Sequence, residues 1–415
     1  MKIRKFLKDF IPYSWEQSNL EIANSIGKSP EDITRFDTNV SHNLPYHWLE
    51  TLSNRLKDIE INKYPDSSYV SVRQLIADYC SRDIDEIILT NGADEGLFMT
   101  GSLFIEPDNK VMLSTPTYSY YEKMAQILGG IPLEIQRKPD FSDDFHTMLK
   151  NLDDNISLII LCNPNNPTGN IINQRDVELF LDNNAADFPI IIDEAYFEYT
   201  GNTLVDLIDK YNNIIIIRTL SKAFGLAGLR VGYIIASKST ISLLNKVRPP
   251  NSVGTISVNL AQIALNDINW MKNNVSYIMK EKKLFEEKLS QLNKVSIIPS
   301  HSNFMLIKFD NKDGSQVHSE LLNNGIVVRD VSSTKGLEKY IRINIGLKDE
   351  NVIRVGGWLL SLLCILIGSY FIWPHIHVAL LGIVFLYLGV RVFNFSTFKE
   401  YAKKRQQLLL KLQKW

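Results

Sequence analysis

The stretch Ser221-Lys222-Ala223-Phe224-Gly225-Leu226-Ala227-Gly228-Leu229-Arg230 says most about the fold of this chain. It follows closely on an apolar run, Ile214 to Ile217, of the kind that forms a buried strand. A lysine at this point, among small and apolar residues, is poorly placed as a solvated surface charge. Desolvation lowers the pKa of a lysine, and a neutral amine can form a Schiff base with an aldehyde. The alternative is an ordinary strand-to-loop junction that carries a surface lysine.

The side chains around this lysine are suitable ligands for a phosphate group. Thr219 and Ser221 supply hydroxyls, and Arg230 supplies a guanidinium that can form paired hydrogen bonds. An amine, hydroxyls and an arginine together suit pyridoxal phosphate (PLP), which is an aldehyde that carries a phosphate. The stretch therefore predicts a PLP site.

Two further segments also follow apolar, strand-like runs. Cys162 to Gly169 (CNPNNPTG) comes directly after Ile156 to Leu161, and its prolines, asparagines and glycine turn the chain. Pro189 to Tyr196 contains an apolar strand that ends in Asp193. Ligands bind outside the carboxyl ends of strands in open α/β sheets, and a carboxylate there can pair with a protonated pyridine nitrogen. Taken alone, Asp193 could be a helix cap and Asn166 a turn residue.

With these segments the chain resembles the class I/II PLP-dependent aminotransferases of fold type I, and is most similar to the histidinol-phosphate aminotransferases. The matching segments are Tyr64-Pro65, Thr90 to Gly96, Asn165 to Gly169, Asp193 to Tyr196, Arg218 to Gly232, Asn303-Phe304, Gly325 to Asp330 and Tyr340 to Ile343. They occur in the family's order over most of the chain. The resemblance implies an α/β fold with a large, mostly parallel sheet domain and a smaller α/β domain.

The resemblance also implies roles for single residues around the cofactor. Lys222 would hold PLP covalently and then move the α-proton of the substrate. The other implied cofactor ligands are Gly92, Ala93, Asp94, Tyr118, Asn166, Asp193, Tyr196, Thr219, Ser221, Arg230 and, from a second subunit, Tyr64. Asp193 would pair with the pyridine nitrogen, whereas Asn166 and Tyr196 would bond the ring hydroxyl oxygen. Tyr118 would stack on the ring, with a core tyrosine as the alternative.

The cofactor phosphate would lie at the start of the helix that opens at Gly92, where free N–H groups favour anions. Only the backbone of Asp94 is assigned to it, since a carboxylate beside a phosphate has the wrong charge.

Two arginines carry the expected recognition of the substrate. Arg342 matches the position that clamps a substrate carboxylate or an equivalent group, for which a planar guanidinium is suited. Arg329 matches the position at which histidinol-phosphate enzymes hold the substrate phosphate, and the alternative is a surface salt bridge with Asp330. Tyr13 would close over the same phosphate. Where the family often has Asn-Glu-Asn-Pro-Tyr, residues 41–46 read Ser-His-Asn-Leu-Pro-Tyr, and this departure lies beside the substrate.

Composition limits the classes of function. The chain has 415 residues with 45 Lys and Arg against 46 Asp and Glu, so a broad basic face for nucleic acid is not expected. Cys80, Cys162 and Cys364 lie far apart, without the spacing of metal ligands, which favours a reducing compartment without disulfides. The start of the chain is basic but lacks the apolar core of a signal peptide.

From about residue 46 onward, apolar runs alternate with helical patterns, which indicates a largely parallel sheet covered on both faces. The predicted strands are Ile87 to Thr90, Val111 to Ser114, Ile131 to Ile135, Ser157 to Cys162, Ile190 to Asp193, Ile214 to Thr219 and Val231 to Ala236. A helical stretch from about Val258 to Leu292 leads to a smaller unit with strands around Asn303 to Phe309 and Tyr340 to Ile345. The expected domains are an irregular arm at 1–45, a large PLP-binding domain at 46–257, and a linking helix with a small domain at 258–353.

The composition changes after the small domain. From Val355 to Val390 the chain has no Asp, Glu, Lys or Arg, and Pro374 offers a break between two membrane-spanning lengths. Basic residues follow, whereas the short loop at Pro374 has none, so both ends are expected to face the cytoplasm. The sequence therefore predicts a C-terminal transmembrane helical hairpin at 354–395 and a basic tail at 396–415, with the enzyme on the cytoplasmic side of a membrane. A soluble buried hairpin and an artificial fusion are the alternatives.

The resemblance implies a transaminase that moves an amino group between L-glutamate or 2-oxoglutarate and a phosphorylated amino compound, histidinol phosphate first. It also implies a homodimer with shared active sites, because Tyr64 would reach the cofactor phosphate of the other subunit. A PLP-dependent decarboxylase of threonine or serine phosphate uses the same lysine and electron sink, and stays open, as does an aminotransferase for another substrate. A membrane scaffold with an inactive enzyme domain is disfavoured, because the motif residues of the PLP site are all present.

Overall fold

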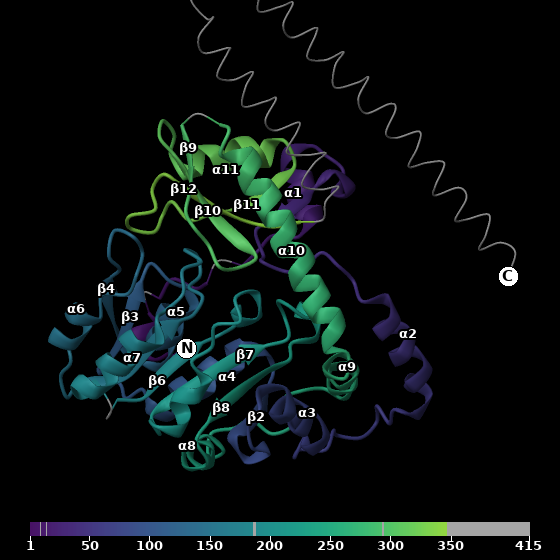
Figure 1. Ribbon diagram of the computed structural model, residues 1–415, viewed down its shortest axis with the longest axis vertical. Coiled ribbons are helices and arrows are strands. Elements are labelled where there is room, and N and C mark those ends of the chain that lie inside the picture. Colours follow the sequence, from purple (N-terminus) through teal and green to yellow (C-terminus); the bar gives the residue numbers. More distant parts are fainter. Residues whose placement is uncertain (9, 14, 186–187, 293, 347–415) are drawn as a thin grey trace, which may run out of the picture. The chain divides into compact units, whose positions relative to one another are not determined.

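The computed structural model describes residues 1–346 apart from residues 9, 14, 186–187 and 293, and residues 347–415 lie outside the described part. The described residues form a seven-stranded sheet and a five-stranded sheet (Figure 1). The long helix α10 (Ile268–Leu289) contacts β9 (Val295–Ile297) of the small sheet and the short helix that follows β6 of the large sheet. It therefore connects the two parts of the enzyme.

The large sheet contains the seven predicted strands, and each end lies within one residue of its expected position. In spatial order they are β2 (Ile87–Thr90), β8 (Gly232–Ala236), β7 (Ile214–Thr219), β6 (Ile190–Asp193), β5 (Ile156–Cys162), β3 (Lys110–Thr115) and β4 (Ile131–Gln136). β8 runs antiparallel to both of its neighbours, and the other pairs are parallel. The carboxyl ends of β5, β6 and β7 therefore lie along one edge of the sheet.

Apolar side chains fill both faces of the central strands. Every residue of β5, β6 and β7 is buried, which is the pattern of a parallel sheet that is covered on both sides. Full burial of one isoleucine contributes about 1.5–3 kcal/mol. α4 (Gly92–Phe104) packs against β7 and β8, and α5 (Tyr120–Leu128) packs against β3 and β4. These contacts fix the strand ends at which the predicted site residues lie.

The remaining helices are short or of medium length. They are α1 (Asn19–Ile26), α2 (Tyr46–Arg55), α3 (Val70–Cys80), α6 (Phe145–Lys150), α7 (Gln174–Phe180), α8 (Lys238–Leu244), α9 (Thr255–Leu265) and α11 (Gly314–Asn323).

The small sheet takes one edge strand from the N-terminal arm. Its order is β1 (Thr34–Phe36), β11 (Ile326–Asp330), β12 (Tyr340–Asn344), β10 (Phe304–Phe309) and β9. β1 pairs in parallel with β11, and the other pairs are antiparallel. The sequence predicts only an irregular arm with short helical pieces here, because a strand of three residues is too short to show an alternating pattern. The pairing of β1 places residues 37–40 beside the ends of the large sheet's strands.

The single helix predicted from about Val258 to Leu292 is instead two helices. α9 ends at Leu265, and α10 begins at Ile268. Between them, the Asp267 carboxylate accepts a hydrogen bond from the Trp270 backbone N–H at 3.3 Å and caps the start of α10. A carboxylate that bonds the backbone in this way competes with a continuous helix.

The predicted fold class included a transmembrane hairpin, and this part is corrected. In the part of the chain that the structure describes, no helix combines the length and the apolar character that a membrane crossing requires. The predicted hairpin at 354–395 and the tail at 396–415 lie outside the described residues. The described residues therefore support the α/β enzyme body, and they give no support to the hairpin, the membrane partner or the membrane-side localisation.

Candidate active site

A cavity of about 630 Å³ lies where the carboxyl ends of β5, β6 and β7 meet the N-terminal arm and the small sheet. The predicted site residues that line it are Tyr13, Ala93, Asp94, Tyr118, Asn166, Asp193, Tyr196, Thr219, Ser221, Lys222, Arg230, Arg329 and Arg342. Two predicted residues, Gly92 and Tyr64, do not line this cavity. Gly92 packs against the guanidinium of Arg230, and Tyr64 is 85% exposed on the surface.

Lys222 follows β7 and extends into the cavity. Its Nζ donates a hydrogen bond to the Thr38 carbonyl oxygen at 3.1 Å. Burial of the amine, with Arg342 and Arg230 nearby, lowers the pKa of Lys222 to about 8. A lysine with this pKa keeps a usable neutral fraction near pH 7, and the neutral form is the nucleophile.

Asp193 is the last residue of β6 and is 4% exposed. Its Oδ2 accepts a hydrogen bond from the Tyr121 hydroxyl at 2.7 Å, and its Oδ1 accepts one from the Ala195 backbone N–H at 3.0 Å. Burial raises the pKa of Asp193 to about 6, although both hydrogen bonds oppose the rise. The carboxylate is therefore mostly ionised at neutral pH, as an acceptor for a protonated ring nitrogen must be.

Asn166 and Tyr196 lie on the two loops that follow β5 and β6. The Tyr196 hydroxyl accepts a hydrogen bond from Asn39 Nδ2 at 3.1 Å. Asn166 Oδ1 accepts one from Arg342 Nη1 at 2.6 Å, and Arg342 Nη2 donates to the Asp37 carbonyl oxygen. The arm residues 37–39 thus contact both the predicted cofactor ligands and the predicted substrate arginine.

The start of α4 and the loop after β7 form one end of the cavity. A Cβ atom on Gly92 would lie 2.5 Å from Arg230 Nη2, so only glycine lets the guanidinium pack there. Arg230 Nη2 lies 2.8 Å from Asp94 Oδ2, and the Thr219 hydroxyl donates to Ser221 Oγ at 2.8 Å. The Asp94 carboxylate is thus paired with Arg230, which agrees with assigning only its backbone to a phosphate.

The small sheet supplies the other end of the cavity. Arg329 on β11 and Arg342 on β12 stand directly opposite each other in the strand register. Arg329 Nη1 lies 3.5 Å from Glu16 Oε1, so its partner is an arm residue rather than the neighbouring Asp330. The Arg329 guanidinium also lies 6.0 Å from the ring centre of Tyr13.

Tyr118 belongs to the aromatic wall of the cavity. Its ring meets those of Tyr13 and Tyr121 edge-on, with centroids 6.4 Å and 5.4 Å away. Its hydroxyl lies 3.5 Å from Asp94 Oδ1. The ring faces the cavity and also packs against the core of the large sheet, so stacking on the cofactor stays a prediction.

Several residues of this site were not predicted from the sequence. Asn39 has φ +54°, a left-handed conformation that asparagine tolerates better than most residues. It lies next to the segment that departs from the family pattern, and its role depends on the distant Tyr196. Tyr121 was missed because three tyrosines fall within four residues, Tyr118 to Tyr121, and their spacing does not show which one reaches Asp193. Glu16 lies in the arm, where no periodic pattern directs attention to it.

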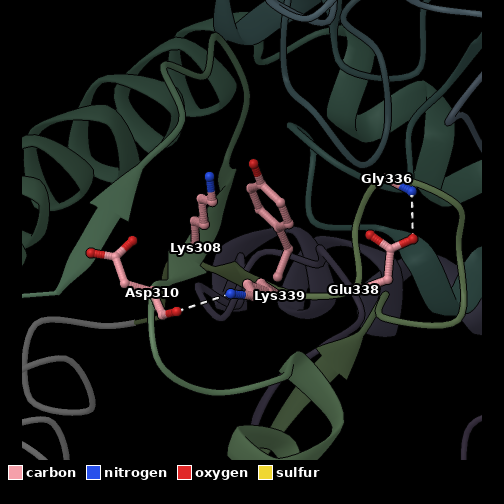
Figure 2. Close-up of a pocket in the computed structure, with 6 residues that line it drawn as sticks. Lys308, Asp310, Gly336, Glu338 and Lys339 are labelled. Carbon is pink, nitrogen blue, oxygen red and sulfur yellow. Dashed lines mark hydrogen bonds between the residues drawn. The ribbon is translucent and has the colours of Figure 1, made fainter.

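A smaller hollow of about 400 Å³ lies on the small sheet. Its lining residues are Lys308, Asp310, Gly336, Glu338, Lys339 and Tyr340. Figure 2 shows two separate hydrogen bonds in it: Lys339 Nζ donates to the Asp310 carbonyl oxygen at 3.0 Å, and the Gly336 backbone N–H donates to the Glu338 carboxylate at 2.9 Å. None of the predicted site residues lines this hollow, so the 630 Å³ cavity is the candidate active site.

The residues of the large cavity fit PLP. A lysine amine of lowered pKa, a buried carboxylate with free lone pairs, two hydroxyls and an arginine at the start of α4 correspond to the aldehyde, the ring nitrogen and the phosphate of the cofactor. The guanidinium of Arg230 packs against Gly92 and therefore lies at the start of α4, where an anion is favoured.

Comparison with known proteins shows the family to which the chain is similar. A histidinol-phosphate aminotransferase from Thermoanaerobacter sp. (strain X514) is 32% identical over 344 residues, which are 79% of this chain and 96% of that protein. The crystal structure of the histidinol-phosphate aminotransferase from Clostridium acetobutylicum matches with a TM-score of 0.71 and 28% identity, over 77% of this chain and 96% of that one. A histidinol-phosphate aminotransferase from Sinorhizobium meliloti, solved in complex with PLP, shares the fold with a TM-score of 0.75 and 23% identity, over 84% of this chain and 94% of that one.

The family model described as aminotransferase class I and II matches residues 32–355, which include every predicted cofactor ligand. The chain therefore belongs to the class I and II aminotransferases, and it is a PLP-dependent transaminase.

Proposed function

We propose that this aminotransferase moves an amino group between L-glutamate and a phosphorylated amino compound, with histidinol phosphate as the first candidate. The observation that carries the proposal is the pair Arg329 and Arg342, which face each other across β11 and β12 in the wall of the Lys222 cavity. The relatives named above are histidinol-phosphate aminotransferases, which supports this choice of substrate.

Two guanidinium groups on directly opposite positions repel each other unless an anion lies between them. Burial lowers the pKa of Arg342, and the charge of Arg329 lowers it further. A dianionic substrate relieves this repulsion. L-glutamate carries two carboxylates and histidinol phosphate carries a phosphate, so one pair of arginines serves both halves of the reaction.

The residues at the strand ends would hold the cofactor. Lys222 would bind it covalently, Asp193 would accept a hydrogen bond from the protonated ring nitrogen, and Asn166 with Tyr196 would bond the ring hydroxyl oxygen. Thr219, Ser221, Arg230 and the backbone of α4 at Ala93 and Asp94 would hold the phosphate. PLP supplies an aldehyde that takes up the substrate amine and a ring that accepts electrons from the bond broken at Cα.

The side chains of the cavity would do the rest of the chemistry. The Lys222 amine is a base of suitable strength to take a proton from the substrate Cα and return it, because its pKa of about 8 lies close to neutral pH. The buried Asp193 carboxylate places a negative charge beside the ring nitrogen of the cofactor, which has to stay protonated. Arg342 and Arg329 would fix the anionic groups of the substrate, so that its Cα is held near Lys222.

The test mixes purified, PLP-loaded protein with histidinol phosphate and 2-oxoglutarate, and measures glutamate and carbon dioxide together. We expect glutamate that depends on the acceptor, and no carbon dioxide. Carbon dioxide released from threonine phosphate or serine phosphate without an acceptor would establish a decarboxylase instead. Arg329→Gln should raise KM for histidinol phosphate, whereas Arg175→Gln, on the exposed face of α7, is the matched control.

We also propose a homodimer with shared active sites. Class I and II aminotransferases are typically dimeric, and Tyr64 is fully accessible and absent from the lining of its own cavity. Tyr46, Ile61 and Val70, which lie in the same stretch of the sequence as Tyr64, are exposed as well. A partner subunit would cover this stretch and bring its cavity within reach of Tyr64.

Mixed dimers test the sharing of sites. Tyr64→Phe and Lys222→Ala chains, each impaired alone, should regain part of the activity when they are mixed and refolded together, because one site of each mixed dimer then carries both wild-type residues. An active enzyme that stays monomeric at assay concentration would exclude the proposal.

A further inference from the structure

Tyr121 occupies an unusual position, because it is fully buried and still reaches the cavity. It lies in the first turn of α5 and is 0% exposed, with its ring in the apolar cluster of the large sheet. Its hydroxyl leaves that cluster and donates to Asp193 Oδ2 at 2.7 Å. Among the described residues, this is the only hydrogen bond that the Asp193 carboxylate receives from a side chain.

Tyr121 also supports the ring of Tyr118. The two rings meet edge-on, with their planes at 88° and their centroids 5.4 Å apart. Tyr121 therefore contacts both residues that are expected to enclose the cofactor ring, Tyr118 on its face and Asp193 at its nitrogen. One rigid, buried side chain fixes these two groups relative to each other.

The Asp193 carboxylate is held from two sides. The Ala195 N–H holds Oδ1 and the Tyr121 hydroxyl holds Oδ2, which leaves further lone pairs of both oxygens for the cofactor. Burial keeps the Tyr121 hydroxyl protonated by raising its pKa well above 10, so it donates throughout the neutral range. The other titratable groups that act on this pair are Lys222, Asp94, Cys162, Tyr118 and Tyr196.

We propose that Tyr121 is a positioning residue of this transaminase, whose hydroxyl keeps Asp193 ionised and oriented toward the cofactor's ring nitrogen. The inference rests on the proposed role of Asp193. Without the hydroxyl, the desolvated Asp193 carboxylate is a stronger base. It then takes the proton that lies between it and the ring nitrogen, and the ring nitrogen becomes neutral. The ring then accepts electrons less readily, although the substrate still binds.

The experiment uses the full chain loaded with PLP that carries ¹⁵N in its ring, and records the ¹⁵N chemical shift from pH 6 to 9. In the wild type we expect a protonated ring nitrogen over the whole range. In Tyr121→Phe, which keeps the packing of the ring, the shift should move toward that of neutral pyridine. Its kcat should fall by about tenfold to a hundredfold, the loss of one hydrogen bond to a charged group, with KM within about threefold.

Two further variants make the result decisive. Tyr199→Phe is the matched control, because Tyr199 is a buried tyrosine whose hydroxyl has no hydrogen-bond partner in the described part of the chain, and it should change neither value. Asp193→Asn should move the shift more than Tyr121→Phe does. Tyr121→Met fills the same space without a hydroxyl and should shift in the same direction, should the Phe variant not fold.

The outcomes separate the two proposals. A wild-type ¹⁵N shift and kcat in folded Tyr121→Phe, beside a displaced shift in Asp193→Asn, would overturn the role of Tyr121 alone. An unchanged shift in Asp193→Asn would instead overturn the assignment of Asp193 on which the inference rests.

Discussion

Lys222 and Lys282 are two buried amines of lowered pKa that lie in different regions of the molecule. Burial lowers the pKa of each amine to about 8, and each amine donates to backbone carbonyl oxygens. Lys222 donates to Thr38 at 3.1 Å, whereas Lys282 donates to Ser302 at 3.0 Å and also to Ser300.

The regions differ in what else lies near the amine. Lys222 shares its cavity with Asp193, Tyr196 and two arginines. Lys282 is 2% exposed on α10 and ties this helix to the turn at 300–302, which precedes β10. A lowered pKa therefore reports that a lysine is buried. Whether the lysine acts in catalysis depends on the groups beside it.

The largest expected effect is the loss of turnover in Lys222→Ala. We expect a fall of at least about ten-thousandfold, because the amine that holds the cofactor and moves the proton is gone. Single-turnover kinetics with saturating PLP and the visible absorbance of lysine-bound PLP measure it. Lys282→Met is the control, and it should retain both. Turnover within tenfold of wild type in Lys222→Ala, with the absorbance intact, would show that the comparison assigns the wrong lysine.

For the stability of the fold, in contrast to turnover, the substitution of Lys282 should have a large effect. Lys282→Met leaves the buried carbonyls of Ser300 and Ser302 without their donor, and we expect the free energy of unfolding to fall by about 2–3 kcal/mol. Urea denaturation of the full chain measures the change, with Lys283→Met, an exposed neighbour on the same helix, as the control. If Lys282→Met instead abolished turnover without loss of stability, the two lysines would not differ in the way described.

Both lysines should contribute to the free energy of unfolding with the same dependence on pH. Each has a pKa of about 8 in the folded chain against an ordinary value of 10.5, so between these values the unfolded state binds more protons. Wild type should therefore gain stability relative to Lys282→Met as the pH rises above 8, by at most about 1.4 kcal/mol per pH unit. Lys222→Ala should show the same trend when both proteins are free of PLP, because only then is the Lys222 amine free to titrate. Unfolding measured at pH 7, 8, 9 and 10 tests this, and a difference that narrows with rising pH would contradict it.

A buried acid should give the free energy of unfolding a pH dependence of the opposite sign. Burial raises the pKa of Glu198, in the short helix Phe197–Tyr199 after β6, to about 8. Its contribution to stability is present below its ordinary pKa and is lost as the pH rises through 8. Glu198→Gln should therefore become more favourable relative to wild type between pH 5 and pH 8, by at most about 1.4 kcal/mol per pH unit. The same unfolding series at pH 5, 6, 7 and 8 measures it, and a constant difference would mean that the carboxyl titrates normally.

The strands of the large sheet were predictable, because each is a continuous apolar run bounded by turn residues. Since Asp193 and Thr219 end such runs, the parallel order of β6 and β7 was enough to bring them to one edge of the sheet. Lys222 lies three residues after Thr219. The N-terminal arm was not predictable in this way, because its strand β1 is only three residues long and gains its order from β11. The transmembrane hairpin was predicted from composition alone, and its residues lie outside the described part of the chain.

The sequence by itself determined which residues lie at the strand ends, and with them the lysine, the carboxylate and the hydroxyls of the cofactor site. Only the tertiary structure decided how these groups are held: Asn39 on Tyr196, Arg342 on Asn166 and Tyr121 on Asp193, across separations of 157, 176 and 72 residues. The physical reason is that the repeat of apolar residues encodes local structure over a few turns or strand residues. A hydrogen bond between distant side chains is instead set by the packing of whole elements, which no local pattern records.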